Sequence, residues 1–243
     1  MSKPTWISHR GVRDTGFTEN SLSAFKLAVS QGFTWLETDL RITSDHHIVL
    51  CHDPSLKRLF GKDRLVHSCT RAQLEDLKYP CGQGMLFLDQ FFTEFARQRW
   101  TFDVKIETAQ NVLGTLRTMV TAMQDSLTVE KNITFLLWSQ DDQLLAEKLF
   151  PHASFFARDD ECWRAGLAII AWLPFFGKIT ANKAYAVPPK LWNLSLFKSR
   201  IFRAYQKRNA RVIAYLPTCN EDALTAVSAG ADLILSDRLF LDQ

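Results

Sequence analysis

The sequence predicts an α/β protein, a (β/α)₈ barrel of the TIM type with a small insertion after the second strand. Three observations indicate this fold. Short runs rich in β-branched and aromatic residues alternate with helical runs along most of the chain. Eight such strand-like runs are present, and several helical runs end on Gly or Asn, as helices commonly do. Eight β/α repeats in 243 residues match the size of one barrel.

The expected strands share a length of five to ten residues. They are TWISH (5–9), FTWLETDLRI (33–42), RWTFDVKI (99–106), NITFLLWS (132–139), ASFFAR (153–158), KAYAVP (183–188), RVIAYL (211–216) and ADLILS (231–236). The expected helices lie at residues 19–32, 107–124, 141–150, 193–209 and 221–230. The pattern is weakest at residues 159–180 and at the C-terminus, which leaves space for only a short last helix. The apolar run from Leu167 to Ile179 is expected to be a buried helix leading into a strand.

One interval breaks the repeat. The residues between the second and third expected strands are about twice as many as a β/α connection needs. We therefore predict a hairpin after the second strand and then an insertion, roughly residues 53–100, with short helices of its own. The chain has no linker, low-complexity tract or internal repeat, so we predict a single domain over residues 1–243.

Composition and charge restrict the possible partners. Hydrophobic residues make up 47% of the chain and charged residues 23%, which is enough for a large core. The net charge is only +3, too weak for a nucleic-acid binder, and favours a small anionic ligand. The most apolar segment, Leu167 to Ile179, contains Pro174 and is too short to span a bilayer, so stable membrane association is not expected. A surface that grazes a membrane is the minor alternative, because Trp172, Phe175 and Phe176 suit an interface.

The cysteines and the N-terminus both bear on localisation. Five cysteines are scattered without a CxxC pair, and an odd number cannot be fully paired within one chain. The first expected strand starts within a few residues of Met1, which leaves no room for a signal peptide. We expect a cytoplasmic protein. Its oligomeric state does not follow from the sequence.

Acidic residues alternate along two of the expected strands. Strand alternation puts Glu37 and Asp39 on one face of the second strand, and it points Asp103 and Lys105 to the same side of the third. Carboxylates gathered in a confined interior repel one another, so they imply either raised pKa values or a cation between them. Oxygen ligands of this kind suit Mg²⁺, Ca²⁺ or Mn²⁺. The alternative is that Glu37 and Asp39 line the wet side of a half-exposed strand.

Other polar residues fall at strand ends, where the active sites of barrels assemble. His9 and Arg10 end the first strand, and His52 with Asp53 ends the return after the second. Two histidines can divide the work of a base and an acid near neutral pH. Asp53 is interpreted either as a partner that fixes the tautomer of His52 or as a turn residue before Pro54.

Five separate pieces of the sequence resemble the glycerophosphodiester phosphodiesterase family. They are HRG after the first strand, ENSLSAF in the first helix, ETDLRITSDHHIVLCHD, DVK and GADLILSDR. The resemblance is dense over residues 6–60, recurs at 101–105 and returns near the C-terminus, while the middle of the chain matches poorly.

The resemblance implies a metal-dependent phosphodiesterase that hydrolyses glycerophosphodiesters to an alcohol and sn-glycerol 3-phosphate. It implies that the catalytic residues are His9 and His52, that the phosphate-contacting residues are Arg10 and Lys105, and that the metal ligands are Glu37, Asp39 and Asp103. Glu19 is expected to orient Arg10 or to support the metal site. Mg²⁺ or Ca²⁺ is the expected metal, with Mn²⁺ as a further candidate. Asn20 is interpreted either as part of this site or as a helix N-cap.

The sequence departs from the family pattern at three places. Thr18 replaces a Pro before Glu19, and Asp103 replaces a Glu that is one methylene longer. The third departure is YLPTCN after the seventh strand, where Tyr215 takes the place of an aromatic residue that packs against substrate. Tyr215 is therefore a candidate substrate-binding residue, with a barrel-lining role as the alternative.

Two further functions stay open. One is a lysophospholipase D-like or cyclising barrel phosphodiesterase, because the secreted sphingomyelinase-D-like toxins also resemble this family. The other is a non-catalytic barrel that binds phosphate esters, with Asp103 as the mark of a decayed metal site. The first predicts turnover of lysophospholipid, and the second predicts binding without turnover.

Overall fold

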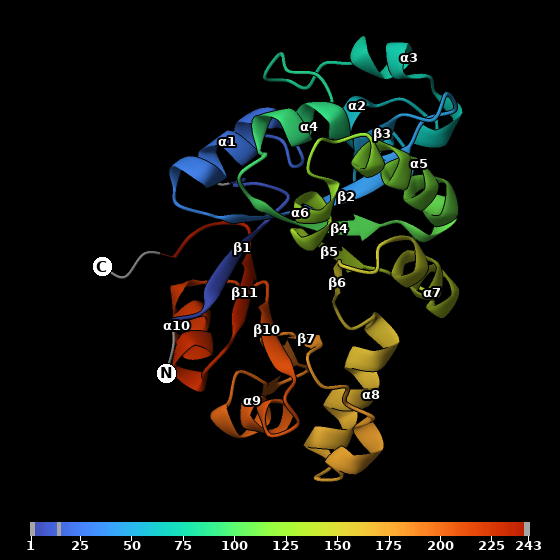
Figure 1. The fold of residues 1–243 in the computed structure, drawn as a ribbon. Helices are drawn as coiled ribbons and strands as arrows, with labels where there is room; N and C mark the ends of the chain where they lie inside the picture. The colour runs from blue at the N-terminus through green and yellow to red at the C-terminus, as the bar shows by residue number, and fades with distance from the viewer. Residues whose placement is uncertain (1–2, 14–15, 241–243) are drawn as a thin grey trace. The chain divides into compact units, whose positions relative to one another are not determined.

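The computed structural model of the 243-residue chain describes residues 3–13 and 16–240. Within these residues the predicted alternation of strands and helices is present, with a strand in each of the eight predicted runs (Figure 1). The predicted fold class, an α/β barrel of the (β/α)₈ type, is confirmed. The chain forms two compact units, Ser8–Ser154 and Met1–Ile7 with Phe155–Gln243, so the single domain stays a prediction.

The Ser8–Ser154 unit contains the end of β1 (Thr5–His9) and most of the elements that follow it. Its strands are β2 (Trp35–Ile42), β3 (Ile48–Leu50), β4 (Arg99–Val104) and β5 (Ile133–Leu136). Its helices are α1 (Leu22–Ser30), α2 (Lys57–Phe60), η1 (Val66–Ser68), α3 (Arg71–Glu75), α4 (Leu88–Glu94), η2 (Ile106–Thr108), α5 (Ala109–Thr121), α6 (Ser126–Lys131) and α7 (Gln140–Leu149). Strands β2, β4 and β5 are parallel neighbours, and β3 returns antiparallel to β2 as the expected hairpin.

Strand β2 is buried along its whole length. All eight of its residues are buried, as in a parallel strand that is covered on both faces. The Trp35 indole donates a hydrogen bond of 2.9 Å to Thr101 Oγ1 on the neighbouring strand, so its one polar atom is satisfied within the core. Strand β4 ends at Val104, two residues before the predicted end, and Ile106 is consequently exposed in η2.

The insertion between β3 and β4 has a small core of its own. Helices α2, α3 and α4 cross it (Figure 1), and apolar side chains from Val49 to Phe87 are buried together inside it. Helix α3 begins at a capping box, in which Thr70 accepts from the backbone of Gln73 and Gln73 accepts from the backbone of Thr70. The insertion is therefore an ordered part of the unit, and the predicted short helices are confirmed.

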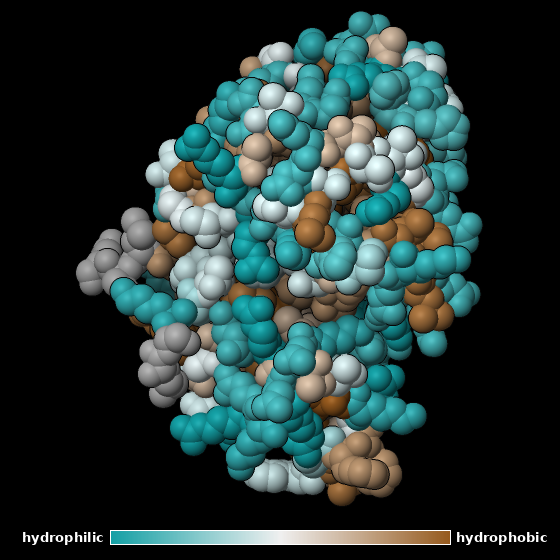
Figure 2. Space-filling model, viewed as in Figure 1, coloured by the Kyte–Doolittle hydropathy of each residue, from teal (hydrophilic) through white to brown (hydrophobic). Residues whose placement is uncertain are grey.

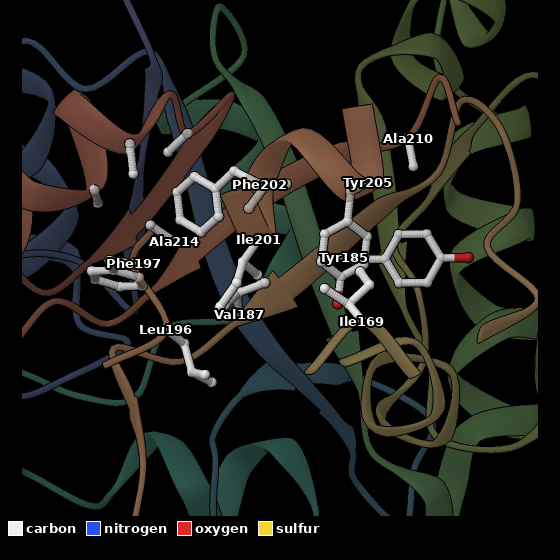
Figure 3. Packing of buried hydrophobic residues seen from close by; sticks show 14 of the residues in the cluster. Ile169, Tyr185, Val187, Leu196, Phe197, Ile201, Phe202, Tyr205, Ala210 and Ala214 are labelled. Atoms are coloured by element: carbon white, nitrogen blue, oxygen red, sulfur yellow. The ribbon is translucent and has the colours of Figure 1, made fainter. Parts of the chain in front are cut away.

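The second unit takes up the remaining elements. They are β6 (Ser154–Phe155), α8 (Asp159–Ile170), η3 (Pro174–Gly177), β7 (Ala184–Val187), β8 (Lys190–Leu191), β9 (Leu194–Ser195), α9 (Ser199–Gln206), β10 (Arg211–Tyr215), α10 (Asn220–Ala229) and β11 (Leu233–Ser236). Strands β7, β10 and β11 are parallel neighbours. Figure 3 shows the core, where Phe202 and Tyr205 of α9 lie among the buried side chains of β7 and β10.

Two predicted elements of this unit are wrong. The helix expected at 193–209 begins only at Ser199, because Leu191 and Leu194 pair across a short hairpin and bring Phe197 into the core. The run from Leu167 to Ile179, expected to be a buried helix leading into a strand, instead holds the end of α8 at Ile170 and the turn η3, and most of its large side chains are exposed. The helix does not continue because Pro174 lacks the backbone N–H and clashes with the preceding turn. No helix among the described residues is both long enough and apolar enough to cross a bilayer.

The turn after β1 depends on Gly11. Its φ is +82°, and a Cβ built there would lie 2.6 Å from Ala24 Cβ and 2.7 Å from the Ala24 carbonyl carbon. We expect Gly11→Ala to lower the free energy of unfolding by about 3 kcal/mol, through left-handed strain plus a clash with the α1 backbone. Urea unfolding followed by circular dichroism measures this change.

Gly61 is the matched control. It has a φ of +66° with no atom within 4 Å of the added Cβ, so Gly61→Ala carries only the conformational strain, about 1 kcal/mol. Equal losses in the two variants would show that the close approach of Gly11 to α1 does not matter.

Candidate active site

Three buried carboxylates meet where β2 and β4 run side by side. Asp39 and Asp103 are partners in the parallel register, and Glu37 lies two residues earlier on the same face of β2. One oxygen from each of Glu37, Asp39 and Asp103 lies within 4.8 Å of the others, and all three residues are buried. Strand alternation and register are therefore enough to assemble the predicted acidic cluster.

Two predicted cations lie in direct contact with this cluster. Lys105 Nζ is 2.6 Å from Asp39 Oδ1 and 2.6 Å from Asp103 Oδ2, so one ammonium bridges the two strands. Arg10 Nε is 2.9 Å from Asp39 Oδ2. These contacts offset much of the repulsion among the carboxylates, because ion pairs are screened far less inside a protein than in water.

Burial and charge move the three carboxyl groups in different directions. Burial first, and then the charges of Asp39 and Asp103, raise the pKa of Glu37 well above its ordinary value. Burial also raises the pKa of Asp103, with the charge of Asp39 adding to the shift. Burial also raises the pKa of Asp39, but the positive charges of Lys105 and Arg10 have the larger effect and lower this pKa to about 2. Asp39 is thus the permanent anion of the cluster.

The loop after β1 holds Arg10 in an uncommon backbone conformation. Arg10 has a φ of 58°, and its backbone N–H lies 3.0 Å from the Glu37 carbonyl and 3.2 Å from Glu37 Oε2. Asn20 has a φ of 56° and donates from Nδ2 to Asp39 Oδ2 at 2.8 Å. The N-cap of α1 is Ser21, so Asn20 is not the helix cap and instead contacts the acidic cluster. Left-handed residues held by several hydrogen bonds are typical of functional sites.

His9 ends β1 beside the acidic cluster. The residue is buried, and its Nε2 lies 4.0 Å from Glu37 Oε2. The predicted catalytic histidine and the predicted metal ligand Glu37 are therefore neighbours, and their catalytic roles stay predictions.

His52 is held at both its backbone and its ring. Its carbonyl oxygen accepts two hydrogen bonds from the Arg41 guanidinium, at 3.0 and 2.8 Å. Its Nδ1 lies 2.7 Å from Asp53 Oδ1, and Arg58 Nε donates to the other oxygen of Asp53. The geometry favours Asp53 as a partner of His52, because a carboxylate at Nδ1 fixes which ring nitrogen carries the proton.

Glu19 forms ion pairs with arginines from the loop after His9 and from the insertion after His52. Its carboxylate lies 3.6 Å from Arg10 Nη1, 3.3 Å from Arg13 Nη1 and 2.6 Å from Arg58 Nη2. Of the two predicted tasks for Glu19, orientation of Arg10 agrees with these distances. Since Arg58 also contacts Asp53, one guanidinium links Glu19 to the partner of His52.

Sequence reasoning missed Arg58 and Trp138. The Trp138 indole donates a hydrogen bond of 2.7 Å to Asp103 Oδ1, and Lys105 donates to the other carboxylate oxygen, Oδ2. Two donors therefore fix the carboxylate of Asp103, whose side chain is shorter than the Glu of the family pattern. Trp138 follows strand β5, and its position at a strand end was a usable signal. Arg58 offered no such signal, because its contacts depend on how the insertion folds.

Tyr215 lies in the other unit, at the end of β10, with 38% of its surface exposed. It follows Val212 and Ala214, which are buried in the core of that unit. Its predicted contact with substrate stays a prediction.

The acidic cluster fits a hard divalent cation. All of its donors are carboxylate oxygens, which suit Mg²⁺, Ca²⁺ and Mn²⁺ better than the softer metals. Oxygens on opposite sides of an ion lie about 4 Å apart for Mg²⁺ and about 5 Å apart for Ca²⁺. The three ligand atoms lie within 4.8 Å of one another, so Glu37, Asp39 and Asp103 can reach one ion with little movement.

Comparison with known proteins identifies relatives. A family model described as the glycerophosphoryl diester phosphodiesterase family matches residues 9–240. A probable glycerophosphodiester phosphodiesterase 1 of Mycobacterium tuberculosis (strain CDC 1551 / Oshkosh) is 38% identical over 76 residues, 31% of this chain. That match spans about a quarter of the relative's own length (27%).

Solved structures show the same fold over almost the entire chain. The glycerophosphoryl diester phosphodiesterase domain of a Mycobacterium tuberculosis protein has a TM-score of 0.81 and 16% identity, covering 98% of this chain and 97% of that one. An Oleispira antarctica phosphodiesterase in complex with the product sn-glycerol-3-phosphate has a TM-score of 0.74 and 18% identity, covering 97% and 93%. With the family model matching nearly every residue of both units, the chain belongs to the glycerophosphoryl diester phosphodiesterase family.

Proposed function

We propose that this protein is a metal-dependent phosphodiesterase that hydrolyses glycerophosphodiesters to an alcohol and sn-glycerol 3-phosphate. The observation that carries the proposal is the buried cluster of Glu37, Asp39 and Asp103 in contact with Lys105 and beside His9. The complex of the Oleispira antarctica relative with sn-glycerol-3-phosphate supports the choice of substrate class.

The charge balance of the site suits a phosphodiester. The three carboxylates exceed the positive charges of Arg10 and Lys105 by one. A divalent cation held by the carboxylates would change that deficit into an excess of one positive charge. A phosphodiester carries one negative charge at neutral pH, so substrate, cation and side chains together are neutral. Mg²⁺ or Ca²⁺ would serve, with Mn²⁺ as a further candidate.

When bound, such a cation would supply charge neutralisation at the phosphoryl oxygens. The chain's own residues supply the rest. Arg10 and Lys105 are positioned to bind the remaining phosphoryl oxygens as charge develops on them. Their pKa values are raised by the surrounding carboxylates although burial opposes the shift, so both stay charged throughout the range in which enzymes work.

His9 and His52 are proposed to move the protons. One histidine takes the proton of the glycerol 2-hydroxyl as its oxygen bonds to phosphorus, and the other gives a proton to the alcohol oxygen as its bond to phosphorus breaks. The product of this step is a cyclic phosphate. Water then opens the ring with the histidines in reversed roles, which restores both protonation states and yields sn-glycerol 3-phosphate.

The direct test is release of sn-glycerol 3-phosphate from glycerophosphocholine by the purified protein. We expect turnover that is lost on chelation and restored by Mg²⁺, Ca²⁺ or Mn²⁺. His9→Ala and His52→Ala should each lower kcat by about 10² to 10⁴-fold, the usual contribution of a positioned acid or base. Glu37→Ala should lower activity at least as strongly, because the cluster loses a ligand.

Controls separate the alternatives. His152→Ala and Glu147→Ala change exposed residues of the same types outside the site and should leave kcat unchanged. Turnover of lysophosphatidylcholine in preference to glycerophosphocholine, or a cyclic phosphate as final product by phosphorus NMR, would point to the lysophospholipase D-like or cyclising function. If the protein binds substrate but shows no turnover with Mg²⁺, Ca²⁺ or Mn²⁺, the proposed hydrolase activity is wrong and the non-catalytic binding function is favoured.

Arg58 is proposed as a positioning residue that acts through Asp53 on His52. Its side chain is 49% exposed, so its ion pairs contribute little to stability and their value is geometric. We expect Arg58→Ala to lower kcat about tenfold, as loss of a supporting partner commonly does, with partial recovery in Arg58→Lys. Steady-state kinetics with a thermal melt measure both effects.

Lys57 is the neighbouring control, since it is exposed and outside the Glu19 network. Lys57→Ala should leave kcat at the wild-type value. A kcat for Arg58→Ala equal to that of Lys57→Ala would remove Arg58 from the catalytic machinery and leave the histidine assignments intact.

A further inference from the structure

Positive charge is concentrated in one part of the second unit. Residues 162–220 contain ten Lys and Arg residues and no Asp or Glu, whereas the rest of the chain has 19 basic and 26 acidic residues. The small net charge of +3 is therefore the sum of a strongly basic segment, residues 162–220, and an acidic remainder of the chain. A continuous run without a single anion favours a polyanionic partner.

The same segment exposes a cluster of large apolar side chains. Trp172, Leu173, Phe175 and Phe176 are exposed by 72%, 55%, 86% and 65%, and Leu167 precedes them on α8 at 51%. Hydrophobic residues are visible at the lower end of the space-filling view, in the region that α8 and η3 occupy in Figure 1 (Figure 2). Exposed apolar clusters of this kind mark interaction sites in soluble proteins.

The turn that carries these side chains is packed firmly against α8. A Cβ on Gly177 would lie 3.2 Å from Ala165 Cα, a tight contact that shows how closely the turn approaches the helix. The Gly177 carbonyl accepts from Arg164 Nε at 3.3 Å, and the Leu173 N–H donates to the Ala168 carbonyl at 2.8 Å. The aromatic side chains are thus held outward by a fixed backbone.

Cations border this apolar cluster. The Arg200 guanidinium lies 5.2 Å from the centre of the Trp172 ring, and Lys178 follows η3 directly. Helix α9 turns Ile201 and Phe202 into the core (Figure 3) and exposes Arg200, Arg203 and Lys207 on its other side. Aromatic side chains beside a basic helix face are typical of surfaces that enter the headgroup region of a bilayer.

We propose that the α8–η3 surface, made of Leu167, Trp172, Leu173, Phe175 and Phe176 with Lys178 and α9 as its basic border, docks reversibly on an anionic lipid bilayer. The aromatic side chains enter the interface, and the cations bind the anionic headgroups. A second copy of the chain fits less well, because self-pairing would bring like charges together. The proposal does not rest on the phosphodiesterase activity, since every residue in it lies in the second unit, outside the acidic cluster.

The test is flotation of the full chain with two kinds of vesicle, phosphatidylcholine alone and phosphatidylcholine mixed with phosphatidylglycerol. We expect binding to the anionic vesicles, weak binding to the neutral ones, and a loss of binding in high salt. Phe175→Ser with Phe176→Ser should weaken binding to anionic vesicles about tenfold or more. Arg200→Gln with Arg203→Gln should weaken it by about fivefold for each cation.

Two controls lie outside the surface. Leu144→Ser removes an apolar side chain of 56% exposure, and Lys148→Gln removes an exposed cation, both on α7. Both should bind vesicles like the wild type. All variants should keep the thermal melt of the wild type, because every substituted side chain is at least half exposed or at the surface.

Three results would overturn the proposal. The first is equal flotation of wild type and the Phe175→Ser, Phe176→Ser variant. The second is equal binding to neutral and anionic vesicles. The third is a wild-type dimer in sedimentation equilibrium that this variant converts to a monomer, which would assign the surface to self-association.

Discussion

Repulsion among the buried carboxylates is the constraint on which the site depends. Glu37, Asp39 and Asp103 share a small volume with little water, and such a group persists only if positive charge is supplied close by. Lys105 and Arg10 supply part of it, which is why Asp39 keeps a low pKa while the pKa values of Glu37 and Asp103 rise. The remaining imbalance suits one more cation, and the oxygen donors define its chemistry.

The surrounding loops stabilise this arrangement from outside. The left-handed backbone at Arg10 and Asn20 lets one loop contact both Glu37 and Asp39. The insertion after β3 supplies Arg58, which contacts Asp53 and Glu19. The insertion therefore contributes to the site although it stands outside the barrel repeat. Its own small apolar core explains how a loop of this length can place one guanidinium reproducibly.

The sequence predicted the features that depend on local periodicity. Alternation along β2 and β4 placed Glu37, Asp39 and Asp103 on one side, and the eight strands followed from composition. Features that depend on contacts between residues far apart in the sequence could not be predicted. Asn20 could be either a site residue or a helix cap by sequence, and only its hydrogen bond to Asp39 distinguishes the two. The apolar spacing before Phe197 is typical of a helix, although the chain forms a hairpin there. Local patterns cannot reveal which distant side chain satisfies a buried polar group.

The most direct test of the central claim is a titration of the protein with Mn²⁺, with free Mn²⁺ measured by electron paramagnetic resonance. The account predicts one site per chain, lost in Glu37→Gln and kept in the exposed control Glu147→Gln. Because the pKa values of Glu37 and Asp103 are raised, protons compete with the ion, so affinity should fall as the pH is lowered. Unchanged Mn²⁺ affinity in Glu37→Gln, or no binding by the wild type, would contradict the account.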